Sequence, residues 1–164
     1  MQDAFSHNTW ATLRVIDTCL TLSPEQLETS VPGTYGSILD TMRHLVAAEA
    51  NYLFVCSGEG PPIEDEDRMD LRELRDAMES FAPPWSVLLA RNPDPDTVLV
   101  RHRDDGSETT APLSIRLAQA VHHGTDHRSQ ICTALTSLGI EPPFIDVWAF
   151  GETDGRVIET PPTS

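Results

Sequence analysis

Hydrophobic residues recur at helical spacing, three and four positions apart, in three long stretches of the chain that contain no proline. Because proline breaks a helix interior, these stretches are where long helices can form. They cover residues 1–23, 33–60 and 113–141. A fourth apolar pattern, over residues 68–91, is interrupted by two adjacent prolines. The pattern therefore predicts four long helical segments.

The ends of the first two helices are marked by residues that cap helices. The first helix is predicted over residues 3–22, and Ser23 can cap the short turn that follows. Its predicted apolar face consists of Phe5, Trp10, Leu13, Ile16 and Leu20. The second helix is predicted to begin at Ser37, because Asp40 stands three residues later, at the spacing of a capping box. Its several alanines indicate a central helix with close neighbours.

Proline and glycine shape the second half of the chain. Pro83 and Pro84 are expected to kink or split the third helix. Alternating residues over 97–110 predict a short β-hairpin. The last helix should open at Pro112 and close at Gly139, the usual asymmetry of helix ends.

These elements predict an all-α fold, namely a four-helix bundle with a short accessory β-hairpin before the last helix. The long connection between the second and third helices also suits such a bundle. One domain is expected over residues 1–150, closed by an apolar cap segment at 141–150. The polar residues 151–164 are expected to form a loose C-terminal tail.

The charge narrows the classes of partner. The chain has 164 residues, of which 11 are basic and 26 acidic, for a net charge of -15. Nucleic acids and anionic membranes both need a basic surface, so neither is an expected partner. The longest apolar run, residues 52–56, is too short to cross a bilayer, and the first residues do not resemble a signal peptide. A cytoplasmic protein that acts on a small molecule is expected.

Histidines are the candidate chemistry of this chain. His123 and His127 are four positions apart on the predicted last helix, where they can share one metal ion. By itself this pair is also compatible with core packing or a solvated face. His127 falls within the apolar stripe, however, where an imidazole without a partner costs free energy. His44 lies on the predicted central helix, so three imidazoles from two helices could leave a fourth coordination position open.

Several other kinds of site do not fit the sequence. It contains no His-Glu-x-x-His or Glu-x-x-His, which argues against a zincin and a di-iron carboxylate bundle. It also lacks a Gly-x-Ser-x-Gly elbow, a P-loop and a dinucleotide fingerprint. The three cysteines, Cys19, Cys56 and Cys132, are widely spaced and are expected to be reduced and mostly buried.

Four segments in order along the chain carry a family resemblance. They are FSHNTWA at 5–11, GSILDTMRHLVAAE at 36–49, HGTDHRSQI at 123–131 and LGIEPPFIDVW at 138–148. Together they resemble the DinB/YfiT-like superfamily. Ser129 departs from its fourth-helix pattern, in which His-Arg-Gly-Gln follows a histidine and three residues.

The resemblance implies a bundle, often dimeric, in which His44, His123 and His127 hold one divalent metal ion, with zinc or nickel favoured over iron. Better-understood relatives are the mycothiol-dependent maleylpyruvate isomerases and the bacillithiol or mycothiol S-transferases. The resemblance therefore implies a low-molecular-weight thiol such as mycothiol as a cofactor. The metal would lower the pKa of this thiol, so that the thiolate attacks a small electrophile.

Residues near the three histidines have weaker candidate roles. Glu49 and Asp126 could accept a hydrogen bond from a ligating imidazole and orient it, although Asp126 could equally be solvated. Arg128 could bind an anionic substrate or pair with a carboxylate on a neighbouring helix.

The predicted function is a thiol-dependent S-transferase or isomerase that uses a metal ion and works as a homodimer. Two alternatives remain open. In one, the protein is a metal-dependent hydrolase in which water instead of a thiol takes the open coordination position. In the other, it is a stress-related metal-binding protein without enzymatic activity. A pocket blocked by large side chains would favour the latter.

Overall fold

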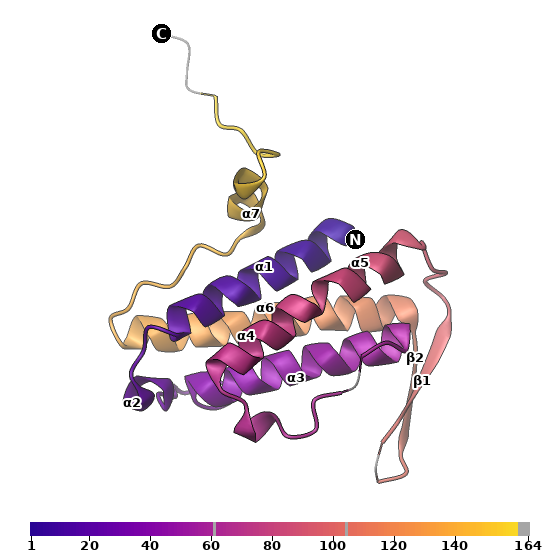
Figure 1. Ribbon diagram of the computed structural model, residues 1–164, viewed down its shortest axis with the longest axis horizontal. Coiled ribbons are helices and arrows are strands. Elements are labelled where there is room, and N and C mark those ends of the chain that lie inside the picture. The colour runs from indigo at the N-terminus through magenta and orange to yellow at the C-terminus, as the bar shows by residue number, and fades with distance from the viewer. Residues whose placement is uncertain (61, 104, 161–164) are drawn as a thin grey trace.

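The computed structural model describes residues 1–60, 62–103 and 105–160, and it is mostly helical with one small antiparallel sheet (Figure 1). Along the chain the elements are α1 (Gln2–Cys19), α2 (Pro24–Leu27), α3 (Ile38–Ser57), the 3-10 turn η1 (Glu66–Arg68), α4 (Leu71–Ser80), α5 (Ala82–Ala90), β1 (Val98–His102), β2 (Glu108–Pro112), α6 (Leu113–Ser137) and α7 (Val147–Thr153). The predicted all-α class and the hairpin before the last long helix are confirmed. Within the described residues, no helix combines the length and the apolar character that crossing a membrane requires.

Capping boxes set the starts of α2 and α3. Ser23 Oγ accepts the backbone N–H of Gln26, and the Gln26 side chain accepts the backbone N–H of Ser23. Ser37 and Asp40 exchange the same pair of bonds at the start of α3. Each box satisfies backbone donors that a helix N-terminus leaves free. The predicted starts at Ser23 and Ser37 are therefore confirmed.

The third predicted helix is split in two. α4 ends at Ser80 and α5 begins at Ala82, so Pro83 and Pro84 lie in the first turn of α5. A proline there removes no helical hydrogen bond, because the first N–H groups of a helix have no partner within it. The prolines thus end one helix and start the next.

Four helical segments enclose the core. α6 packs between α1 and α3, and the α4–α5 pair contacts both α1 and α3 on the opposite side (Figure 1). One apolar cluster lies toward α2 and includes Val15, Ile16, Met42, Leu45, Leu74, Met78, Ile131 and Leu135. The other lies toward the hairpin and includes Phe5, Leu53, Trp85, Leu113 and Leu117. Along α1, α3 and α6, the buried polar residues Asn8, Glu49 and Arg128 lie between members of the two clusters.

The buried face of α1 differs from the predicted one. Phe5 and Ile16 are buried as expected, but Trp10 is only partly buried. Asn8 and Thr12 are buried instead, at 1% and 0% exposure. Polar residues can occupy such positions only when partners inside the protein satisfy them. The apolar pattern alone could not reveal those partners.

The hairpin is tied to α6. β1 pairs antiparallel with β2, with Val98 opposite Pro112, so the second strand runs two residues past the predicted end. Arg116 of α6 donates from Nη2 to the backbone oxygens of Leu99 at 3.1 Å and Thr109 at 2.7 Å. The hairpin therefore has a defined position over α6, although it extends beyond the helices in Figure 1.

The C-terminal segment packs against α1 but covers little of the core. His7 Nε2 lies 2.7 Å from the backbone oxygen of Ile145, and Arg156 pairs with Asp3 at 2.6 Å. The apolar cap expected at 141–150 is only partly packed, since Phe144, Val147 and Trp148 are 71%, 63% and 72% exposed. The tail expected from residue 151 begins inside α7, and its residues 161–164 lie outside the described part.

Candidate metal centre

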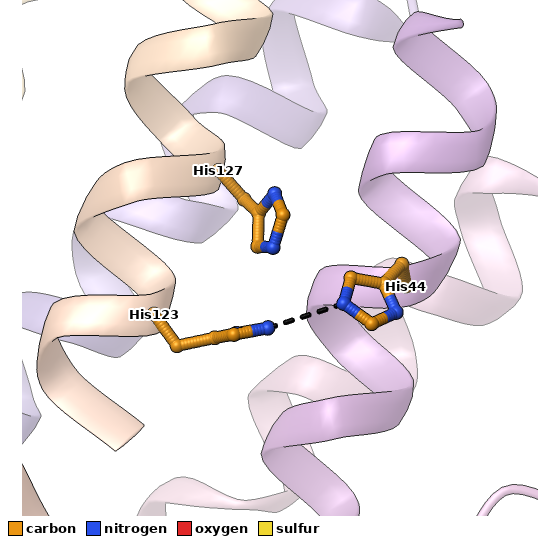
Figure 2. Close-up of side chains that lie close together, drawn as sticks. All are labelled: His44, His123 and His127. Atoms are coloured by element: carbon orange, nitrogen blue, oxygen red, sulfur yellow. Dashed lines mark hydrogen bonds between the residues drawn. The ribbon is translucent and has the colours of Figure 1, made fainter. Parts of the chain in front are cut away.

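Three histidines converge between two long helices. His44 comes from α3, and His123 and His127 come from successive turns of α6 (Figure 2). One nitrogen of each ring lies within 4.8 Å of the corresponding atoms of the other two. The Nε2 atoms of His44 and His123 are 3.2 Å apart. The structure thus brings together the three residues that the sequence singled out.

The local structure explains this convergence. Residues four positions apart stand one above the other on a helix, so His123 and His127 project from the same face of α6. α3 packs along that face and brings His44 opposite them. Ala48, one turn after His44 on α3, carries only a methyl group. Space therefore remains beside the rings, and Ala48 lines it.

The donor set fits a divalent metal ion. Two nitrogens that each lie about 2.0–2.1 Å from a tetrahedral zinc are about 3.3–3.4 Å apart, close to the spacing of His44 Nε2 and His123 Nε2. Burial, followed by the neighbouring His127 and His44, lowers the pKa of His123 to about 4. Burial, followed by His127, also lowers the pKa of His44. At neutral pH both rings are therefore uncharged, which is the form that binds a metal.

Gln130 orients the ring of His127. Its Oε1 accepts the backbone N–H of Tyr35 at 2.8 Å and lies 3.2 Å from His127 Nδ1. Because Oε1 is an acceptor, His127 Nδ1 must carry the proton that forms the second bond. The lone pair of that ring is then on Nε2. Such a contact selects the tautomer and holds the ring that would bind a metal.

Tyr35 and Glu66 complete the surroundings of the cluster. The Tyr35 ring stacks on His44, with centroids 4.1 Å apart and an interplanar angle of 11°. Glu66 Oε1 lies 4.0 Å from His44 Nδ1, on the side away from the Nε2 that faces His123. These two residues restrict the position of His44 from the loop before α3 and from η1.

Replacing Gln130 by Met is expected to weaken metal binding by about 10- to 100-fold, because the bond that orients His127 is lost while all three imidazoles remain. Titration of the metal-free protein with zinc, followed by isothermal calorimetry, measures the change. Ser129→Ala, at the exposed preceding position, is the matched control and should bind zinc like the unaltered protein. Equal affinities for the two variants would contradict this role of Gln130.

In the described part of the chain, the other three candidates make no hydrogen bond to the three histidines. Glu49 accepts hydrogen bonds from Trp85 Nε1 at 2.7 Å and Asn8 Nδ2 at 3.2 Å. Arg128 donates from Nη1 to Asn8 Oδ1 at 2.6 Å. Glu49 and Arg128 are each 2% exposed. Asp126 is exposed, which agrees with the alternative in which its side chain is solvated. Glu49 and Arg128 thus belong to a buried polar network that Asn8 bridges, and Arg128 faces a carboxylate on another helix.

The buried network requires close approach of α1 and α6. A Cβ built on Gly124 would overlap Asn8 Oδ1 and lie 2.7 Å from Arg128 Nη1. Burial raises the pKa of Glu49 to about 7, against the opposing effects of Trp85, Asn8 and Arg128. Burial likewise lowers the pKa of Arg128 to about 10, and Glu49 opposes that shift. Each charge therefore makes the other less costly to bury.

A cavity opens beside the histidine rings. It encloses about 280 Å³ and is lined by His44, Ala47, Ala48, Asn51, Tyr52, Pro62, Ile63, Glu66, Arg101 and His123. A neighbouring cavity of about 910 Å³ shares Asn51, Pro62, Ile63 and Arg101 with it. Together they lead from the histidines along α3 to the hairpin. A small molecule therefore has both room and a path to the cluster.

Sequence reasoning did not assign roles to Tyr35, Gln130, Glu66 or Arg101. Gln130 had a signal, because it stands three residues after His127 and lies on the same side of a helix. The other three come from a loop, from η1 and from a strand. No spacing along the chain relates such residues to a site on two helices.

Comparison with protein-family models gives a match. The family model described as the DinB family matches residues 1–159. No curated protein matches the chain. The match spans the histidine cluster, the cavity beside it and the hairpin.

Proposed function

The chain belongs to the DinB family, and from this membership and the three-histidine cluster we propose that it is a metal-dependent enzyme. His44, His123 and His127 hold one divalent metal ion. A low-molecular-weight thiol such as mycothiol then reacts with a small electrophile, either by S-transfer or by isomerisation. In this proposal α1, α3, α6 and the α4–α5 pair form the family's four-helix bundle.

The cavity beside the histidines is the observation that carries the proposal. His44 and His123 line it, so a ligand can reach the position beside them. A metal ion held by three imidazoles would supply Lewis-acid activation of a ligand at its remaining coordination position. A purely metal-binding protein has no need of such access. The open cavity therefore favours an enzyme over the non-enzymatic alternative.

The cysteines of the chain support an external thiol. Burial raises the pKa of Cys19 to about 12 and the pKa of Cys56 to about 11, so neither forms a thiolate readily at neutral pH. Among the described residues, no cysteine lines the cavity beside the histidines. Under this proposal the reactive sulfur must enter with a small molecule.

A thermal-shift experiment with a panel of low-molecular-weight thiols tests the proposal. Thiols should raise the melting temperature of the zinc- or nickel-loaded protein, because a ligand at 100 times its dissociation constant stabilises the folded state by about 2.7 kcal/mol. For a chain of this size that corresponds to a shift of several degrees. The same thiols should leave the chelator-treated protein unchanged.

The matched control replaces each thiol by the analogue that carries a hydroxyl group in place of the sulfhydryl. If the hydroxyl analogues raise the melting temperature equally, or if no thiol does, the thiol-dependent reaction is wrong. The metal-dependent hydrolase would then be the better account. The identity of the metal, a homodimeric state and a cytoplasmic location stay predictions of the sequence.

A further inference from the structure

Arg101 is the basic side chain that lines the cavity beside the histidines. The described lining residues of that cavity include one guanidinium, from Arg101, and one carboxylate, from Glu66. Arg101 also lines the larger neighbouring cavity and a third one, of about 220 Å³, beneath the hairpin. It thus stands where the three cavities meet. A ligand that extends from the histidines toward the hairpin comes within reach of it.

The strand that carries Arg101, β1, is held in place by contacts with α6. Arg101 is paired with Thr109 across the hairpin. Arg116 of α6 donates from Nη2 to the backbone oxygens of Thr109 and of Leu99, two residues before Arg101. Arg116 is 8% exposed, so these bonds lie away from solvent. The backbone at Arg101 is therefore fixed relative to α6, which also carries His123.

Tyr52 lines the cavity beside the histidines together with Arg101. It lines both the cavity beside the histidines and the one beneath the hairpin. Its ring centroid is 5.6 Å from that of His123, and its hydroxyl oxygen accepts a hydrogen bond from Gln119 Nε2 at 3.3 Å. The O–H of Tyr52 is then left to donate to a ligand. Arg101 and Tyr52 together offer charge and a hydrogen-bond donor on one wall.

We propose that Arg101 binds a carboxylate group of the small molecule that occupies this cavity. This inference rests on the proposed function, because it names the chemical class of the ligand at that site. A planar guanidinium matches a carboxylate with two parallel hydrogen bonds. In the cavity beside the histidines, this single guanidinium balances one negative charge, which a carboxylate supplies. Glu66, near His44, keeps the carboxylate at the Arg101 end.

Paired acids and amides test the inference, since each pair differs only in the carboxylate. The first pair is 3-mercaptopropionate and 3-mercaptopropionamide, which represent a thiol that carries the carboxylate. The second is propionate and propionamide, which represent an electrophile that carries it. Ligand-observed NMR titration of the zinc-loaded protein measures the dissociation constants. At least one acid should bind about 10- to 100-fold more tightly than its amide, as expected for hydrogen bonds to a charged group.

Arg101→Gln should abolish that preference while leaving the affinity for the amide unchanged, and Arg101→Lys should keep part of it. Arg91→Gln, at an exposed position outside all three cavities, removes the same charge and should keep the full preference. The pair that responds to Arg101→Gln identifies whether thiol or electrophile carries the carboxylate. The inference is overturned if neither acid is preferred, or if Arg91→Gln has the same effect as Arg101→Gln.

The result is separable from that of the proposed function. If 3-mercaptopropionamide binds the zinc-loaded protein and neither acid is preferred over its amide, the thiol-dependent function stands and the carboxylate subsite is wrong. If propionate shows a preference that depends on Arg101 while 3-mercaptopropionamide does not bind, the subsite stands and the thiol-dependent function is wrong.

Discussion

The double variant His44→Ala, His127→Ala is expected to reduce bound metal from about one ion per chain to near zero. Three ligand nitrogens lie within 4.8 Å of one another, and the variant leaves only His123. One imidazole cannot hold a divalent ion against water, because protein sites of this kind use three or four ligands. Elemental analysis after dialysis against a weak chelator measures the metal content.

His122→Ala is the matched control for the double variant. His122 is an exposed neighbour of His123 on α6, so its loss removes an imidazole without altering the cluster. This control should retain the metal. Its melting temperature should fall when a strong chelator is added, as that of the unaltered protein should. The metal centre is excluded if the control and the double variant contain the same amount of metal.

Arg128→Met is expected to destabilise the fold by about 3–5 kcal/mol at pH 8, because it leaves the buried carboxylate of Glu49 without a nearby cation. At pH 5 the loss should be smaller, about 1–3 kcal/mol, since only hydrogen bonds to groups such as Asn8 and Thr12 disappear. Urea unfolding at the two pH values measures both losses. Arg72→Met, on the exposed face of α4, should change stability little at either pH.

The direction of the pH effect follows from the pKa of Glu49. Its pKa in the folded protein, about 7, is above its ordinary value of 4.5, so the folded state binds this proton more tightly. The stability that Glu49 contributes is present below pH 4.5 and is lost as the pH rises through 7. In Glu49→Gln this contribution is absent, so the difference in unfolding free energy between this variant and the unaltered protein should change between pH 4.5 and pH 7.

For Arg128→Met, an equal loss of stability at pH 5 and at pH 8 would show that Arg128 and Glu49 are not coupled.

Much of the fold could be predicted because its signals are local. The capping boxes at Ser23 and Ser37 involve residues three apart. The division of the third predicted helix at Pro83 follows from the proline ring, which leaves the backbone nitrogen without a hydrogen to donate. The apolar stripe of α6 is also a local signal, and its members Leu113, Leu117, Ala120, Gly124, His127, Ile131 and Leu135 are buried. α1 was harder, because Asn8 is buried by virtue of bonds to Glu49 and Arg128, which lie far away in the sequence.

Some residues of the candidate site could likewise be predicted from local sequence signals, and others could not. The spacing of His123 and His127 on one helix face follows from helix geometry, and the resemblance of residues 36–49 to a known pattern pointed to His44. The assignments of Glu49 and Arg128 as neighbours of a ligand could not be decided from spacing. Each residue lies near the histidines in sequence, yet its side chain extends toward α1.

By itself, the sequence determined the long helices, the capped starts of α2 and α3, the hairpin and the histidine pair, because these depend on interactions over a few residues. Only the tertiary structure decided which helix faces meet. Gly124 lets α1 approach α6, and this approach places Arg128 in the buried network instead of the cavity. The packing of the hairpin on α6 brings Arg101 to the cavity beside the histidines. Such contacts join residues tens of positions apart, so they depend on how the whole chain packs.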